Sequence, residues 1–368
     1  MRWTDLRVGY RCNQACRFCD LAPQVAAANT GSPEPDGPAV GAALAAIPHR
    51  EGVILAGGEV TTRPDLPALV ELAKAAGFRR IALQTNGSVL AAAGAAAHLR
   101  KLGLTDLAVA LHSPEAAVHD WLTGTPGAFR RATTAVRQAR VAGLTVRIHA
   151  VVTRTTTPQA AALVELAARL GATAIRFVMC REEGAAKPEA RMLAPRLSLA
   201  AEALTAALER ARLLGIELET VGLPLCMNAE LRPVAADRLD APSPERAFAG
   251  AEEAPRSPRH TDTCVSCSLR SACGGVEPAY LDRWGDDELA PPGGPRPFAD
   301  PLRLELGDAF SSRTLRQRLV QGQARGATRV VLDGPGDHPD RGALVRECER
   351  LGLEVAGDPT PHASAQPR

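Results

Sequence analysis

The chain alternates short apolar runs with longer amphipathic runs from residue 1 to about residue 220, and this alternation is the strongest constraint on its fold. The short runs have the length of buried strands, and the longer runs have the spacing of helices. Several helical runs end in a glycine just before the next strand, where glycine supplies a left-handed cap. These glycines are Gly77, Gly143, Gly171 and Gly215. Repeated units of this kind build a parallel sheet covered by helices.

The pattern predicts an α/β fold in the form of a partial (β/α)6 barrel, similar in plan to a TIM barrel. Strands are expected at residues 6–10, 52–56, 81–84, 107–111, 146–152, 174–178 and 216–220. Helices are expected at residues 39–47, 66–76, 90–102, 129–142, 158–170 and 197–214. In parallel barrels, ligands gather at the carboxyl ends of the strands.

Four parts of the chain are predicted. Residues 1–222 form the barrel, and residues 223–292 form a small module that carries cysteines. A stretch rich in proline, alanine and charge, 232–263, reads as irregular, as does a linker at 293–302. Residues 303–357 regain α/β character as a small appendage, and 358–368 form a disordered tail.

Composition narrows the classes of partner. The 43 basic residues nearly balance the 41 acidic ones, so charge gives no reason to expect nucleic acid. No apolar stretch approaches the ~20 residues that span a membrane, and the start has no signal-peptide core. We therefore expect a cytoplasmic protein with no membrane partner. In that reducing compartment its nine cysteines indicate metal ligands or free thiols rather than disulfides.

Three of these cysteines, Cys12, Cys16 and Cys19, follow the first expected strand in the spacing C-x₃-C-x₂-C. Three thiolates on one loop can hold three irons of a [4Fe–4S] cluster and leave the fourth iron open for a small molecule. The same spacing can begin a zinc site. The loop alone leaves both alternatives open.

Polar or glycine-rich motifs follow the next three expected strands. They are Gly57-Gly58-Glu59, Thr85-Asn86-Gly87 and His112-Ser113. Two glycines let a backbone approach a ligand closely, and a carboxylate accepts hydrogen bonds from an ammonium group. Each motif by itself is also an ordinary strand-to-helix turn.

In this order the motifs resemble those of the radical S-adenosylmethionine (radical SAM) superfamily, over about residues 6–290. The resemblance implies an enzyme that reductively cleaves SAM at a [4Fe–4S] cluster, giving a 5′-deoxyadenosyl radical that abstracts a substrate hydrogen. It places the cluster on Cys12, Cys16 and Cys19. By the same resemblance the residues that bind SAM are Gly57, Gly58, Glu59, Thr85, Asn86 and Ser113.

Two positions depart from the family pattern. Val60 stands where a proline usually follows the GGE motif, and Thr123 stands where many members place an arginine. Arg147, His149 or Arg154 could replace that arginine toward the SAM carboxylate, although each is also an ordinary barrel or surface residue.

A second cysteine group, Cys264, Cys267 and Cys273, has the metal-ligand spacing C-x₂-C-x₅-C, and Cys226 could supply a fourth thiolate. Four thiolates suit a [4Fe–4S] cluster or a structural zinc, and the spacing does not separate the two. By resemblance to the SPASM or twitch extension of radical SAM enzymes, we expect one auxiliary [4Fe–4S] cluster. Cys180, at the end of the sixth expected strand, could touch substrate or metal, but we expect it, like Cys348, to be a buried thiol.

The resemblance implies a small-molecule substrate or a peptide, and an electron donor such as flavodoxin or ferredoxin. The chain starts directly on its first strand, which argues against a leader-peptide domain before it. The non-enzymatic alternative is a zinc-stabilised binding protein. It leaves the GGE motif and the three-cysteine loop unexplained, because structural zinc normally takes four ligands.

One internal similarity crosses the chain. Segments 53–80 and 330–355 share six residues at a fixed spacing, including Pro64 with Pro339 and Gly77 with Gly352. The second segment is either a decayed copy of a barrel unit or an unrelated strand–helix unit with a similar cap. At that spacing Gly334 takes the place of Glu59, and no catalytic role is expected for it.

Overall fold

A computed structural model describes residues 2–239, 245–249, 258–292, 302–306, 315–316, 319–320, 323, 328–335 and 337–355. The chain divides into two compact units. The first contains residues 1–265 and 269–289, and the second contains residues 266–268 and 290–368. The expected tail and most of the expected linker at 293–302 lie outside the described residues.

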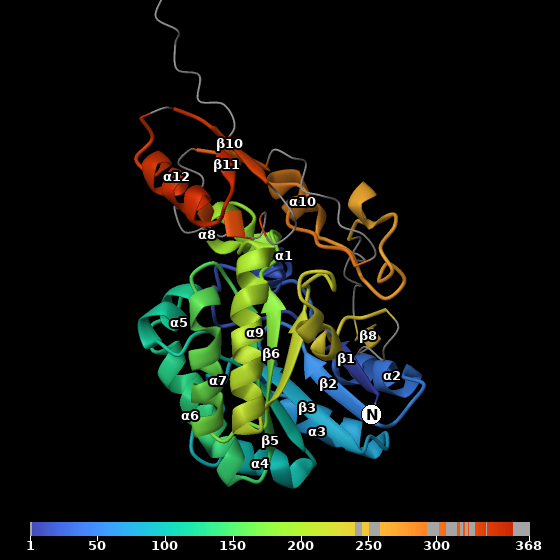
Figure 1. Ribbon diagram of the computed structural model, residues 1–368. Helices are drawn as coiled ribbons and strands as arrows, with labels where there is room; N and C mark the ends of the chain where they lie inside the picture. The colour runs from blue at the N-terminus through green and yellow to red at the C-terminus, as the bar shows by residue number, and fades with distance from the viewer. Residues whose placement is uncertain are drawn as a thin grey trace, which may run out of the picture. The chain divides into compact units, whose positions relative to one another are not determined.

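The first unit is built on a single eight-stranded sheet in which every neighbouring pair is parallel, curled into a half-barrel (Figure 1). Its order is β7-β6-β5-β4-β3-β2-β1-β8. The strands are β1 (Trp3–Arg7), β2 (Gly52–Ala56), β3 (Arg80–Thr85), β4 (Asp106–Ala110), β5 (Thr145–Val152), β6 (Ala174–Met179), β7 (Glu217–Val221) and β8 (Glu245–Phe248).

Helices connect these strands, and several of them lie side by side, as α7 does with α9 (Figure 1). They are α1 (Ala22–Asn29), α2 (Gly37–Ala46), α3 (Leu66–Ala75), α4 (Ala95–Leu102), α5 (Ala116–Thr123), α6 (Ala128–Val141), α7 (Ala160–Arg169), α8 (Ala190–Leu193), α9 (Leu197–Leu214) and α10 (Pro278–Trp284). Short 3₁₀ turns are η1 (Val60–Thr62), η2 (Thr157–Gln159), η3 (Gly184–Ala186), η4 (Ala229–Val234) and η5 (Asp262–Cys264). No helix in the described part of the chain is long and apolar enough to cross a membrane.

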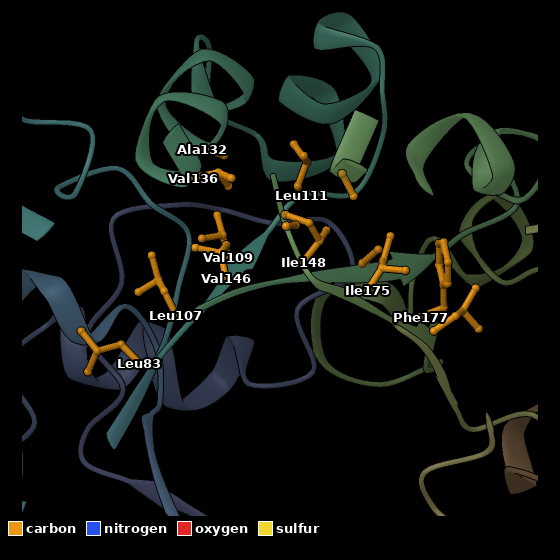
Figure 2. Close-up of a cluster of buried hydrophobic side chains, with 14 of the residues drawn as sticks. Leu83, Leu107, Val109, Leu111, Ala132, Val136, Val146, Ile148, Ile175 and Phe177 are labelled. Carbon is orange, nitrogen blue, oxygen red and sulfur yellow. The ribbon is translucent and has the colours of Figure 1, made fainter. Parts of the chain in front are cut away.

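The hydrophobic core lies between the sheet and its helices. Alternate residues of a strand point to opposite faces of a sheet. In β5 the buried positions Val146 and Ile148 pack in the core, together with Val136 of α6, as Figure 2 shows. The intervening positions Arg147 and His149 face the inside of the half-barrel, where they line cavities. The helix-facing side of the sheet is therefore apolar, and its inner side carries the polar groups.

The sequence located most of these elements. The bounds of β2 and α9 match the expected ranges, and all four expected glycine caps have positive φ. The prediction of six strand–helix units is incomplete, because the sheet has eight strands. The last of them, β8, lies within 232–263 and pairs in parallel with β1, so that stretch is not wholly irregular. Its four residues, ERAF, lack the apolar run by which the other strands were recognised.

Four helices of the first unit were not expected from the sequence, namely α1, α5, α8 and α10. Each has eight residues or fewer, which leaves little periodicity to detect. The first strand also begins three residues earlier than expected, at Trp3. Residues 8–10 instead continue past the strand into the cysteine loop.

The second unit contains a three-stranded parallel sheet in the order β11-β10-β9. Its elements are β9 (Leu302–Glu305), β10 (Arg329–Asp333), α12 (Arg341–Arg350) and β11 (Glu354–Val355). Cys348 is fully buried in its core, as expected of a structural thiol.

The internal similarity corresponds to a shared geometry. Helices α3 and α12 both have ten residues, and each follows a parallel strand after which the next residue is a glycine with positive φ. A Cβ on Gly57 would lie 1.8 Å from Gly9 O, and one on Gly334 would lie 2.5 Å from Leu306 O. In its position after the strand, Gly334 therefore corresponds to Gly57 and not to Glu59. The reason is that the loop between strand and helix is shorter in segment 330–355 than in segment 53–80.

Candidate functional site

The three N-terminal cysteines line one cavity of about 290 Å³ beyond the carboxyl ends of the strands. Cys12, Cys16 and Cys19 are each half-buried. The same cavity is lined by Gly57, Gly58 and Glu59 after β2, and by Thr85 and Asn86 at the end of β3. The parallel sheet therefore brings together motifs that are more than 60 residues apart in the sequence.

Gly57 and Gly58 have no Cβ and so allow the backbone of residues 9–11, which leads into the cysteine loop, to pack closely against them. The Gly58 N–H donates to Gly9 O at 3.0 Å, and the Glu59 N–H donates to Arg11 O at 2.7 Å. A Cβ on Gly58 would lie 2.1 Å from Tyr10 O, well inside van der Waals contact. The sequence suggested that these glycines make room for a ligand. In the structure, the close neighbour is the protein's own backbone.

Two further glycines support the loop from other elements. A Cβ on Gly124, after α5, would lie 2.6 Å from Ala15 O, and one on Gly184 would lie 2.3 Å from Cys19 O. Hydrogen bonds follow the same contacts, from Ala15 N–H to Thr123 O at 3.2 Å and from Ala185 N–H to Cys19 O at 2.9 Å. Sequence reasoning missed both glycines, because nothing local shows which backbone will pack against them.

Two asparagines fix the start of the loop. The Asn29 amide accepts from the Cys12 N–H at 3.2 Å and donates to Cys12 O at 2.9 Å. The Asn13 amide donates to the Ser88 hydroxyl at 2.8 Å and accepts from the Asn86 amide at 2.8 Å. The loop is thereby tied to α1 on one side and to the turn after β3 on the other.

Glu59 is buried and its carboxylate is saturated with hydrogen bonds. It accepts from the Thr85 hydroxyl at 2.6 Å, from the Asn86 N–H at 2.5 Å, and from both the N–H and the hydroxyl of Thr61. Burial raises the pKa of Glu59, and these hydrogen bonds oppose that shift. The side chain therefore holds the turn after β3 against the turn after β2, at the wall of the cavity.

The three thiols act on one another electrostatically. Burial, and then the neighbouring Cys19 and Cys12, raise the pKa of Cys16. Burial also raises the pKa of Cys12 and raises that of Cys19 to about 11. A cation bound by these side chains would oppose the shifts and favour the thiolate forms.

Nowhere in the described part of the chain do three histidine, cysteine, aspartate or glutamate side chains converge as ligands of one metal ion do. In a [4Fe–4S] cluster each thiolate binds a different iron, so the ligands surround the whole cluster and do not converge on one metal ion. Three half-buried thiols along the wall of one cavity fit that requirement.

His112 and Ser113, which follow β4, differ in whether they line the cavity. The Ser113 hydroxyl donates to Gln159 Oε1 at 2.7 Å and accepts from the Glu115 N–H at 2.9 Å, and Ser113 does not line the cavity. The geometry therefore does not support Ser113 as a contact to SAM. His112 does line the cavity, and its Nδ1 accepts from the Val151 N–H at 3.1 Å. Burial lowers the pKa of His112 well below its usual value, so the ring is neutral.

Of the three residues considered in place of the family's arginine, only His149 lines the cavity with the cysteines. Arg147 pairs with Glu219 further down the half-barrel, and Arg154 donates to Arg191 O at 3.3 Å. Arg7 of β1 and Arg176 of β6 also line the cavity, and sequence reasoning missed both. The signal was present in principle, because each lies at an inward position of its strand.

The second cysteine group is organised differently. Cys273 is buried in a small cluster with Leu225, which immediately precedes Cys226. Cys264 is half-buried at the end of η5, and Cys180 is half-buried in another cluster near Leu193. Cys267 lies in the three residues 266–268 that group with the second unit. The auxiliary cluster stays a prediction from the sequence.

The chain is similar to a known family, to two curated enzymes and to solved structures. Residues 6–167 match the family model described as the Radical SAM superfamily. The matched stretch is less than half of the chain; it begins in β1, includes the cysteine loop and extends past β5, and it is similar to a radical SAM superfamily domain.

Two curated relatives are enzymes. The chain is 34% identical over 122 residues to an AdoMet-dependent heme synthase of Methanosarcina barkeri, covering 33% of this chain and 34% of that one. It is 28% identical over 178 residues to a probable GTP 3′,8-cyclase of Metallosphaera sedula, covering 47% and 55% respectively. The chain thus spans about a third to about half of the length of these relatives.

Among solved structures, Streptococcus suis SuiB bound to S-adenosylmethionine has a TM-score of 0.57 at 14% identity, covering 78% of this chain and 76% of that one. A structure of SuiB bound to the precursor peptide SuiA has a TM-score of 0.50 at 17% identity, covering 62% and 51%. At these identities the likeness shows the fold, an α/β half-barrel like those of radical SAM structures.

Proposed function

We propose that this protein is a radical SAM enzyme that takes a hydrogen atom from a substrate held inside the half-barrel. Cys12, Cys16 and Cys19 would hold a [4Fe–4S] cluster, and the SAM cofactor would lie against Gly57–Glu59 and the turn at Thr85 and Asn86. The observation that carries the proposal is that these residues, from three separate strand ends, line one cavity. When bound, the cluster and SAM together supply reductive cleavage of the sulfonium and a carbon radical that abstracts hydrogen.

The chain's own residues position these groups. Asn29 holds both backbone groups of Cys12, and Gly58 and Gly184 let the loop pack onto β2 and η3. Glu59 fixes the turn that presents Asn86. Apolar side chains such as Phe18 and Val178 line the same cavity and limit the access of water to the reacting atoms.

The substrate and the electron donor are proposed only as classes. The relatives are named for heme and for GTP, and SuiB has been solved with a precursor peptide. We keep both a small molecule and a peptide as substrates, with flavodoxin or ferredoxin as the reductant. We also propose one auxiliary [4Fe–4S] cluster on Cys264, Cys267 and Cys273, with Cys226 as the fourth ligand.

The test is anaerobic reconstitution with iron and sulfide, followed by SAM and dithionite, with iron and 5′-deoxyadenosine measured together. Wild type should form the nucleoside. The Cys12/Cys16/Cys19→Ala variant should form none while it keeps about four irons for the auxiliary cluster. Cys180→Ala is the matched control, because this thiol lies at the end of β6 but outside the cavity lining, and it should behave as wild type.

Three results would count against the proposal. Zinc in place of iron in the wild-type protein would favour a metal-stabilised binding protein. Nucleoside formation that survives the triple substitution would remove the cysteine loop from the reaction. Full iron content in a Cys226→Ala variant would remove Cys226 from the auxiliary site.

A further inference from the structure

A second cavity, of about 900 Å³, lies inside the half-barrel at the amino ends of the strands, and we call it the lower cavity. Its wall includes Trp3, Arg80 and Thr145, each of which is the first residue of its strand. Its lining contains neither the N-terminal cysteines nor Gly57–Glu59. The side chains at which it meets the cysteine cavity are Ile54, Gln84, His149 and Arg176.

The lower cavity exists because small residues occupy inward positions of the sheet. Ala82 of β3, Ala108 of β4 and Ala174 of β6 line it. The neighbouring Leu83 and Ile175 point the other way, into the core under the helices, as Figure 2 shows. In a closed barrel the inward positions carry bulky branched residues that fill the interior in layers. Protein interiors keep few large voids, and this one has the size of a ligand pocket.

The arginines in the middle of the lower cavity are paired with carboxylates. The Arg80 guanidinium donates to the Asp106 carboxylate at 2.7 Å. Arg147 and Arg176 both donate to Glu219, Arg176 at 2.7 Å. These side chains form the wall as ion pairs and not as separate charges.

The charges of the whole wall also balance. At its edge Arg2 pairs with Glu51 at 3.2 Å, and the remaining carboxylate, Glu217, is exposed. The four arginines of the wall thus face four carboxylates, when Glu51 is counted with its partner. Burial lowers the pKa of His149 to about 3, so this ring adds no charge at neutral pH. An ion that entered the lower cavity would lose hydration and gain no surplus countercharge.

Trp3 supplies a flat apolar surface in this wall. Trp3 and Gly52 are register partners on β1 and β2. A Cβ on Gly52 would lie 2.6 Å from the Trp3 ring, so the ring lies directly against the backbone of β2. The Trp3 side chain is half-buried and lines the lower cavity. A planar ring that enters the cavity can therefore stack on it.

Gln84 supplies an uncharged polar group. Its side-chain amide lines the lower cavity and forms no hydrogen bond with any described residue. An amide group offers donors and an acceptor side by side, so it pairs well with another donor–acceptor edge.

We propose that the lower cavity binds an uncharged planar molecule with an amide-type edge, which stacks on Trp3 and pairs with Gln84. This site goes beyond the proposed function, because it requires neither the cluster nor SAM and lies apart from the residues proposed to hold them.

The test compares three small probes of similar size. Benzamide is planar and uncharged, cyclohexanecarboxamide is uncharged and not planar, and benzoate is planar and charged. Binding is followed by saturation-transfer NMR on the full-length reconstituted protein, with excess SAM and no reductant. Benzamide should bind at least about threefold more tightly than cyclohexanecarboxamide, as expected for aromatic stacking, and at least about tenfold more tightly than benzoate.

Two variants of one strand locate the site. Ala108→Leu fills part of the lower cavity and should weaken benzamide binding at least about tenfold, with an unchanged or higher melting temperature. Ala110→Leu is the matched control, because Ala110 lies two residues further along β4 and lines only the cysteine cavity. It should bind benzamide as wild type does.

A third variant tests the stacking surface. Trp3→Leu should weaken benzamide binding about threefold and remove the preference over cyclohexanecarboxamide. If Trp3→Leu fails to fold in a thermal melt, the contrast between Ala108→Leu and Ala110→Leu decides.

Equal binding of benzamide and cyclohexanecarboxamide would overturn the proposal, as would tighter binding of benzoate or absence of any benzamide binding. Benzamide that is displaced by SAM, or that binds unchanged to Ala108→Leu, would lie elsewhere, and either result would also overturn it. A protein that binds benzamide as described and yet makes no 5′-deoxyadenosine would support this site and count against the proposed function.

Discussion

The two cysteine-rich regions of this chain look alike in sequence and differ in how the fold holds them. The loop at Cys12–Cys19 is fixed by partners that are distant in the sequence, such as Asn13 with Ser88, 75 residues away, and Arg17 with Glu189, 172 residues away. The hydrogen bonds around Cys273 join residues that are nearer in the sequence, although Leu225 also packs in its cluster. His260 contacts Cys273 O at 3.0 Å, and Arg259 pairs with Val276 in a two-way backbone bridge.

The difference teaches that two cysteine groups with similar spacing can be held by contacts of very different range. A loop held by distant contacts takes its geometry from the whole half-barrel, so its ligands are placed only when the sheet has formed. A region held by local turns can take its shape from its own segment. The first loop should therefore respond to substitutions in several remote elements, and the second should not.

The largest effect is expected from Gly58→Ala. The added Cβ would lie 2.1 Å from Tyr10 O and 2.5 Å from Arg11 O, so two backbone segments would have to separate. We expect a loss of about 3 kcal/mol in the free energy of unfolding, together with loss of iron from the first loop. Chemical denaturation of the apo-protein and iron analysis of the reconstituted protein measure these two effects.

The matched substitution for Gly58→Ala is Gly274→Ala in the second region. The nearest atom to a Cβ there is Asp237 O at 4.0 Å, so the unfolding free energy should change by no more than about 0.5 kcal/mol. Equal destabilisation by the two substitutions would contradict the comparison.

Acid should destabilise the first unit through the buried side chain of His119. Burial lowers the pKa of His119 from 6.5 to about 4 in the folded chain. The unfolded chain therefore binds more protons between these values. The stability from this group is complete above about pH 6.5 and falls as the pH drops toward 4, by about 3 kcal/mol in total.

This dependence is measured by denaturation of the apo-protein at pH 7, 5.5 and 4.5. A His119→Gln variant should show a shallower decline with falling pH than the wild-type protein. Parallel declines in the two proteins would assign the acid sensitivity to other groups.

Glu59→Gln tests the buried carboxylate that joins two strand ends. A carboxylate accepts all of its hydrogen bonds, whereas the amide group of glutamine would face at least one of the donors Thr61, Thr85 and Asn86. We expect the unfolding free energy to fall by about 2 kcal/mol and SAM binding to weaken. Calorimetric titration with SAM and a denaturation curve measure both. A variant as stable as wild type would mean that these hydrogen bonds do not hold the turn after β3.

The smallest effect is expected from Asn29→Ala, which removes both hydrogen bonds to the backbone of Cys12. The site is partly exposed, so the expected loss is about 1 kcal/mol, with faster loss of iron to a chelator. Asn29→Asp keeps the acceptor for the Cys12 N–H, so its stability and its rate of iron loss should lie between those of wild type and of Asn29→Ala. His260→Asn, in the second region, should leave the release of iron from the first loop unchanged.

Much of the candidate site could be predicted from the sequence. Cys12, Gly57, Glu59 and Asn86 were expected at the ends of strands, and in a parallel sheet those ends meet at one edge. The expected glycine caps and the bounds of α9 also agree with the structure, because caps and apolar periodicity are local signals. Ser113 had the same kind of local signal, yet its hydroxyl is committed to Gln159.

Other parts could not be read from the sequence, since they depend on which segments pack together. β8 has no apolar run of its own and is defined by its pairing with β1. Arg176 is an ordinary residue of its strand until the curl of the sheet places it with Arg7 and His149 in one cavity.

The sequence by itself determined the order of the strand–helix units and the chemistry available at their ends, namely thiols, glycines and one carboxylate. Apolar periodicity, helix caps and the types of ligand side chain are local signals, because each is contained within a few residues and does not depend on distant parts of the chain. Only the tertiary structure decided that Gly58, Gly124 and Gly184 contact the cysteine loop. It also decided that the Glu59 carboxylate accepts hydrogen bonds from Thr61, Thr85 and Asn86. The glycine contacts depend on three-dimensional closeness between backbones more than 40 residues apart, and no local pattern specifies that closeness.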